Sequence, residues 1–151
     1  MRLVSISVRN YRVLRDVHVD LDPSLTLVGA PNETGKSTLI EAAHRALFLR
    51  ARTTGKLREA MLSQGRAEHP EVGVSFFARG KSWQVFKKFA GAAGQCALTE
   101  VGGSTWHGDD AEGPGLDLPQ MGAGQPRGVP ADPREDDRQL LSRPGIHRVA
   151  V

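Results

Sequence analysis

The chain has 151 residues, 39% hydrophobic and 25% charged, and its 20 Lys and Arg outnumber 17 Asp and Glu to give a net charge of +3. This length fits one ordinary domain of about 100–150 residues and excludes a multidomain assembly. The apolar runs fall far short of the roughly 20 residues that a membrane-spanning helix needs, and the first residues lack the apolar stretch of a signal peptide. A single cysteine, Cys96, excludes an internal disulfide. We therefore expect a cytoplasmic protein with no membrane contact.

The composition changes near residue 108. Residues 1–108 carry 15 Lys and Arg and 9 Asp and Glu, a balance of +6, whereas residues 109–151 carry 5 Arg and 8 Asp and Glu, a balance of −3. The second block has no aromatic residue and is rich in Gly and Pro, which is typical of disordered chain. Its mixture of Gly, Pro, Arg and Asp is also what GC-rich DNA gives in a wrong reading frame. We expect a folded unit over residues 1–107 and, over residues 108–151, a tail that is disordered or translated out of frame.

The first part of the chain has the pattern of strands. Apolar residues alternate with polar ones over residues 3–8 and again over residues 17–21, which predicts two half-buried strands. Residues 25–28 are more uniformly apolar, as is typical of a strand buried in a sheet.

A helical pattern begins at Lys36. Apolar residues recur there at spacings of three and four, which predicts a helix up to about Arg50 after a loop at residues 30–35. A shorter helix is expected near residues 57–62.

The next elements are again strands. Residues 72–76 and 81–89 flank Arg79 and Gly80, and this pattern predicts a hairpin. One more strand is expected over residues 95–101. Strands and a long helix together favour an α/β fold with antiparallel hairpins.

The loop before the long helix has the spacing of a Walker A phosphate-binding loop, with alanine in place of the usual first glycine. Such a loop turns backbone N–H groups inward, and the helix N-terminus adds partial positive charge. Gly35 allows the backbone to approach phosphate closely, Lys36 reaches the β- and γ-phosphates, and the Ser37 hydroxyl ligates Mg²⁺. Thr38 lies near the α-phosphate, whereas the Glu33 carboxylate must point to solvent or a partner. The predicted nucleotide site comprises Ala30, Pro31, Asn32, Glu33, Thr34, Gly35, Lys36, Ser37 and Thr38. A strand–helix turn without a ligand is the alternative.

Two segments carry a resemblance to a known family. Residues 3–12 read Leu-Val-Ser-Ile-Ser-Val-Arg-Asn-Tyr-Arg, and residues 31–42 read Pro-Asn-Glu-Thr-Gly-Lys-Ser-Thr-Leu-Ile-Glu-Ala. They resemble the start of the SMC/RecF/SbcC group of AAA-type ATPases, most closely the bacterial SbcC- and YhaN-like DNA-repair proteins. Over residues 1–107 the resemblance implies the N-terminal lobe of an ABC-type ATPase head, a partial P-loop NTPase fold with an antiparallel β-subdomain.

The same resemblance implies ligands and partners. It implies binding of ATP and Mg²⁺, pairing of two heads around two nucleotides, and action on DNA ends or chromosome structure. It also implies that Arg12 contacts a phosphate or the base of the nucleotide. From the residues alone, a solvated arginine at a strand end is an equal alternative.

Two motifs that hydrolysis requires in this group are missing from the sequence. No apolar run leads into an Asp-Glu pair, and no Ser-Gly-Gly signature is present. Asp109 and Asp110 follow Trp-His-Gly rather than a buried strand, so they are poor candidates for the Walker B acids. We therefore expect the chain alone not to hydrolyse ATP and to be the N-terminal fragment of a DNA-repair ATPase. The alternatives are a non-catalytic or inert fragment and a fragment of an ABC-transporter-type ATPase. Without a Walker B strand beside it, the strand at residues 25–28 is expected to have an open edge.

For the aromatic and basic residues outside the loop, a structural role is expected and a functional role is the alternative. We expect the aromatic residues of the hairpin to lie in the core rather than to stack on bases. Two basic groups are expected to be solvated, with DNA contact as the alternative. These residues are Trp83, Phe86 and Phe89 for the aromatic set, and Lys87 with Lys88, and Arg50, Arg52, Lys56 and Arg58, for the basic groups.

Overall fold

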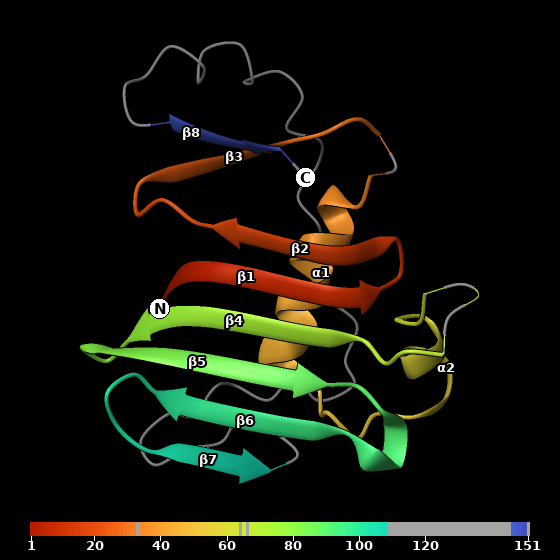
Figure 1. Ribbon diagram of the computed structural model, residues 1–151. Helices are drawn as coiled ribbons and strands as arrows, with labels where there is room; N and C mark the ends of the chain where they lie inside the picture. Colours follow the sequence, from red (N-terminus) through yellow and green to blue (C-terminus); the bar gives the residue numbers. More distant parts are fainter. Residues whose placement is uncertain (33, 64, 66, 109–145, 151) are drawn as a thin grey trace, which may run out of the picture.

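The computed structural model describes residues 1–32, 34–63, 65, 67–108 and, for the backbone, 146–150. Figure 1 shows most strands joined in one twisted sheet, with the long helix α1 behind it and a small second sheet at its edge. In chain order the elements are β1 (Arg2–Tyr11), β2 (Leu14–Asp20), β3 (Leu25–Gly29), α1 (Lys36–Phe48), α2 (Gly55–Glu59), β4 (Glu71–Ala78), β5 (Lys81–Lys88), the 3₁₀ turn η1 (Gly91–Ala93), β6 (Gln95–Glu100), β7 (Thr105–Gly108) and β8 (Ile146–Ala150).

The large sheet is antiparallel throughout, with strand order β2-β1-β4-β5-β6-β7. The expected hairpin is confirmed as β4 and β5, which pair from Ala78 opposite Lys81. Between them Arg79 and Gly80 both have positive φ, 52° and 77°. A two-residue turn with two left-handed residues matches the twist of antiparallel strands, so the dipeptide fixes the register of the hairpin.

Helix α1 covers one face of this sheet, where it packs on β1, β4 and β5 (Figure 1). Successive strand residues point to opposite faces, so the side chains facing the helix form cross-strand rows. One row joins Ile6, Val74, Val85 and Leu98, none more than 1% exposed. The helix contributes mainly buried alanines and leucines, whose small size lets it lie close to the sheet. These residues are Leu39, Ala42, Ala43, Ala46 and Leu47.

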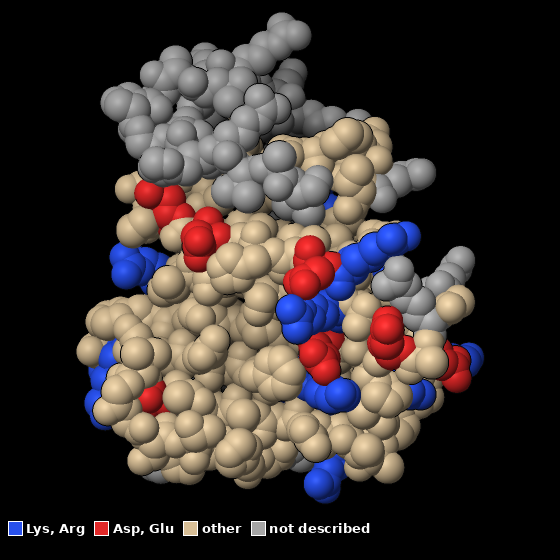
Figure 2. Space-filling model, in the orientation of Figure 1, with Lys and Arg blue, Asp and Glu red and all other residues tan. Residues whose placement is uncertain are grey.

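The opposite face of the sheet is turned to the viewer in Figures 1 and 2. One row across it reads Asp16, Arg9, Glu71 and Lys88. Its neighbours pair as Arg9 with Asp16 at 3.2 Å and Lys88 with Glu71 at 3.1 Å. Figure 2 shows red and blue side chains alternating on this face, beside a broad uncharged surface. The charges of this row therefore neutralise one another.

Of the three aromatic residues expected in the core, two are buried and one is exposed. Trp83 and Phe89 lie in the core, 3% and 0% exposed, as expected. Phe86 is 41% exposed, because it lies on the outer face of the sheet, and its assignment to the core was wrong.

The strand before the loop differs most from expectation. β3 pairs in parallel with β8, from Leu25 opposite Ile146 to Gly29 opposite Ala150, so one of its two edges is covered, and no other described strand pairs with it. Neither is it deeply buried, since Leu25 is 40% exposed and the rest of β3 is half-buried. Residues 109–145 lie outside the described residues, and the disorder or out-of-frame origin expected of the tail stays a prediction there.

The remaining boundaries shift by a few residues. α1 ends at Phe48 rather than near Arg50, and α2 begins and ends slightly before the expected range. No helix among the described residues is long and apolar enough to cross a membrane.

Candidate nucleotide-binding site

The predicted phosphate loop connects β3 to the N-terminus of α1. Gly35 is the N-cap residue and has a φ of 103°, which L-residues with a side chain rarely adopt. No side chain caps the helix, and its first turn has no acidic residue. The partial positive charge at the start of α1 is therefore not neutralised by a carboxylate of that turn.

The Lys36 ammonium closes the loop. Its Nζ donates to the carbonyl oxygens of Ala30 and of Pro31, the latter at 2.9 Å. The Thr34 hydroxyl donates to the same Pro31 oxygen at 2.8 Å. The Lys36 ammonium is thus held at the start of the loop by two neutral backbone acceptors.

The other predicted loop residues take different positions. Asn32 and Ser37 are exposed, and Thr38 is half-buried. Glu33 lies outside the described residues. The structure therefore brings Lys36, Thr34 and the start of α1 together, and leaves Ser37 exposed.

The β1–β2 turn, Arg12 and Val13, contacts the loop from the side. A Cβ built on Gly35 would lie 2.5 Å from Leu14 Cδ2 and 3.0 Å from Val13 Cγ2. Gly35 is thus required both by its φ and by the approach of this hairpin. The sequence analysis expected close approach of the Gly35 backbone to phosphate, and not this contact with the hairpin.

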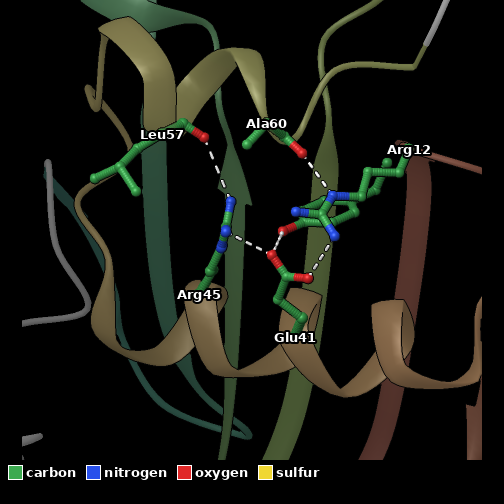
Figure 3. A network of polar contacts seen from close by, with 6 residues as sticks. Arg12, Glu41, Arg45, Leu57 and Ala60 are labelled. Carbon is green, nitrogen blue, oxygen red and sulfur yellow. Dashed lines mark hydrogen bonds and ion pairs between the residues drawn. The ribbon is translucent and has the colours of Figure 1, made fainter. Parts of the chain in front are cut away.

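The Arg12 guanidinium lies on α1 and on the segment after α2 (Figure 3). Its Nη1 is 2.7 Å from Glu41 Oε2, and its Nε donates to the Ala60 carbonyl at 2.5 Å. Its φ of 50° is left-handed. A contact of Arg12 with nucleotide stays a prediction, and the structure gives this side chain a defined position beside the site.

Glu41 is a residue that the sequence analysis missed. Its Oε1 also lies 2.5 Å from Arg45 Nη2, and it accepts a 3.4 Å hydrogen bond from the Tyr11 hydroxyl. The spacing of four residues between Glu41 and Arg45 is a signal for a helix ion pair, whereas nothing in the sequence indicates Arg12 as a second partner. Burial raises the pKa of Tyr11, and the nearby Glu41 carboxylate adds to this effect, so the hydroxyl keeps its proton.

The two adjacent lysines of β5 do not form a basic surface. Lys87 is fully buried and donates to the Leu49 carbonyl at 2.6 Å, just beyond the C-terminus of α1. Lys88 points to the other face and pairs with Glu71. The reading of both as a solvated face, and its DNA-contact alternative, was therefore wrong for Lys87. In the second basic group, Arg58 is half-buried, while Arg50, Arg52 and Lys56 are exposed.

Comparisons with known proteins agree with this arrangement. A family model described as an AAA domain matches residues 5–88, more than half of the chain. The chain is 28% identical over 95 residues to the DNA double-strand break repair Rad50 ATPase of Halobacterium salinarum, which covers 63% of this chain and 10% of that protein. It is 30% identical over 79 residues to the DNA replication and repair protein RecF of Roseiflexus castenholzii, with 52% and 19% covered. The chain thus spans less than a fifth of the length of these relatives.

The chain also aligns with two solved structures at low sequence identity. The SMC head domain from Thermotoga maritima aligns with a TM-score of 0.48 and 19% identity, over 68% of this chain and 38% of that chain. The recombination mediator protein RecF with ATP aligns with a TM-score of 0.45 and 18% identity, over 72% and 27%. Because the family match covers more than half of the chain, the chain belongs to the AAA domain family.

Proposed function

We propose that the chain binds ATP with Mg²⁺ through residues 30–38, as part of a DNA-repair ATPase of the Rad50 and RecF kind. The observation that carries the proposal is the position of Lys36, whose ammonium lies over the loop at the uncapped N-terminus of α1. A phosphate group would take the place of the Ala30 and Pro31 carbonyls as its acceptor. Backbone N–H groups of the first turn would bind the same anion.

The other residues of the loop have roles in the same proposal. The exposed Ser37 hydroxyl would ligate Mg²⁺, which neutralises charge on the phosphates, and Thr38 would lie toward the α-phosphate. Ala30, Pro31, Asn32, Glu33 and Thr34 would form the wall of the loop around the β-phosphate. Without Walker B acids and a signature motif, this chain alone binds nucleotide but does not turn it over.

The test is Mg·ATP binding by calorimetry with Lys36→Ala. The variant should weaken binding by at least about tenfold, since a charged hydrogen bond to phosphate contributes about 1.5–3 kcal/mol. Lys88→Ala is the matched control, because Lys88 pairs with Glu71 on the far face of the sheet, and it should bind like the wild type. Equal affinity of the wild type and Lys36→Ala would contradict the site. Phosphate release above the Lys36→Ala level would contradict the absence of turnover.

A second proposal concerns DNA. Arg50, Arg52 and Lys56 are exposed within a short stretch between α1 and α2, and this is the basic group that the tertiary structure leaves at the surface. Phosphate contacts from such a group would give binding that weakens steeply with salt. Both relatives named above are DNA-repair proteins, which favours DNA as the polyanion.

A further inference from the structure

We propose that Glu41 is a positioning residue of the nucleotide site, because its carboxylate holds the β1–β2 turn against Gly35 through Arg12. This inference rests on the proposed ATP site and assigns to it a residue outside the loop. Glu41 lies on the second turn of α1, beyond the reach of the Walker A pattern.

The carboxylate of Glu41 joins two cations. Arg12 Nη1 lies 2.7 Å from Oε2 and Arg45 Nη2 lies 2.5 Å from Oε1, with the Glu41 side chain 29% exposed (Figure 3). Arg45 also donates to the Leu57 carbonyl at 3.3 Å. Without the negative charge, two guanidinium groups would face each other, and their repulsion would push Arg12 away from the helix.

Arg12 is fixed by bonds on every side. Its backbone N–H donates to the Met61 carbonyl at 3.1 Å, and its own carbonyl accepts from the Ser63 hydroxyl at 2.7 Å. Its Nε donates to the Ala60 carbonyl. A left-handed φ in a residue other than glycine costs energy and persists only where surrounding contacts determine it. The Glu41 ion pair is the one charged contact of this set.

The residues after Arg12 connect its position to the phosphate loop, because they contact Gly35. Val13 and Leu14 lie against the backbone of Gly35, close enough to leave no room for a Cβ. Gly35 is both the N-cap of α1 and the residue before Lys36, and its carbonyl accepts the first helix bond from Leu39 at 2.8 Å. A shift of the turn therefore changes the packing around the residue that orients the phosphate-binding N–H groups.

Two measurements on the full chain test this chain of contacts. The first is the Kd for Mg·ATP of Glu41→Gln, which keeps the size of the side chain and removes its charge. The second is amide hydrogen exchange of Arg12 by NMR without nucleotide. Glu71→Gln is the matched control, because Glu71 also forms an ion pair, with Lys88, but on the outer face of the sheet.

We expect Glu41→Gln to weaken Mg·ATP binding by about tenfold and to speed exchange at Arg12 by a similar factor, with Glu71→Gln within about twofold of wild type in both. Arg12→Gln removes the same ion pair from the exposed turn and serves if Glu41→Gln does not fold. Added to Arg12→Gln, the Glu41 change should cost less than about twofold further, because both act through one contact.

The outcomes separate this inference from the proposed site. Tighter ATP binding by Glu41→Gln would overturn it, since Glu41 would then withhold Arg12 from the nucleotide. Unchanged exchange at Arg12 would overturn it even if the wild type binds ATP. A wild type that binds no ATP contradicts the proposed function, and faster exchange in Glu41→Gln would still establish that Glu41 holds the turn.

Discussion

Leu14 packs against the backbone of Gly35 so closely that a Cβ on the glycine would lie 2.5 Å from Leu14 Cδ2. This contact joins the first hairpin of the sheet to the N-cap residue of α1. The shape of the loop at residues 30–35 thus depends on strands that precede it in sequence. A change at Gly35 should therefore affect both the packing of the hairpin and the proposed ligand site.

Gly35→Ala should lower the free energy of unfolding and weaken Mg·ATP binding. A left-handed φ alone costs an L-residue roughly 1–2 kcal/mol, and the contact with the hairpin adds to it. Gly80→Ala is the control, because Gly80 also has a positive φ, 77°, but nothing lies within 4 Å of its Cβ position. Urea unfolding and calorimetric titration measure the two effects. If Gly80→Ala weakened ATP binding as much as Gly35→Ala, the loss would reflect stability rather than the loop.

Lys87→Met should destabilise the protein by about 1–3 kcal/mol, because the Leu49 carbonyl loses its charged donor inside the core. Methionine keeps most of the volume, so the effect reports the lost bond rather than a cavity. Lys88→Met, at the next position and 38% exposed at its side chain, should change stability by less than about 1 kcal/mol. Equal effects of the two substitutions in urea unfolding would show that the bond at the end of α1 contributes nothing.

Tyr11 makes the stability of the protein depend on pH at the alkaline end. Its pKa in the folded protein is raised above the ordinary value of 10.0, mainly by burial. The unfolded chain therefore loses the phenol proton first, so this contribution is fully present below about pH 10 and declines as the pH rises toward the folded pKa. Tyr11→Phe should lose that part of the decline, up to about 1.4 kcal/mol per pH unit.

Absorbance of tyrosinate gives a direct check, because Tyr11 is the single tyrosine of the chain. The native protein should titrate at a higher pH than the chain in urea. A common midpoint for the two would show that the phenol is not buried as described.

Replacing Arg50, Arg52 and Lys56 together by Gln should weaken binding to duplex DNA, measured by fluorescence anisotropy across a salt series. The slope of log K against log salt is negative, and each lost phosphate contact should reduce its magnitude by about 0.9. The control variant carries three other substitutions by Gln, at basic residues that pair with acidic neighbours. Its salt slope should differ from that of the wild type by less than about 0.9, the value for one phosphate contact. These residues are Arg9, Lys81 and Lys88. If the variant at Arg50, Arg52 and Lys56 kept the wild-type salt slope, these residues would not contact DNA phosphates.

The order of strands, loop and helix follows from local patterns. Alternation predicted β1, β2 and the β4–β5 hairpin, and three- and four-residue spacing predicted α1, because these periods follow from backbone geometry. The loop residues were evident for the same reason, since their chemistry depends on neighbours along the chain. β7 and β8 were not predicted at all, and the short apolar run of β3 does not say which strand will pair with it.

What the sequence by itself determined is the strands and helices from β1 to β6 and the predicted phosphate loop between β3 and α1. Only the tertiary structure decided what distant side chains do. Lys87 and Lys88 are identical neighbours in the sequence. In the sheet they point to opposite faces, so Lys87 bonds to the end of α1 in the core and Lys88 forms a surface ion pair. Likewise, Arg12 and Glu41 meet only because the first turn folds onto α1. The physical reason is that the backbone period is set locally, whereas the partner of a charged side chain is set by which elements pack together.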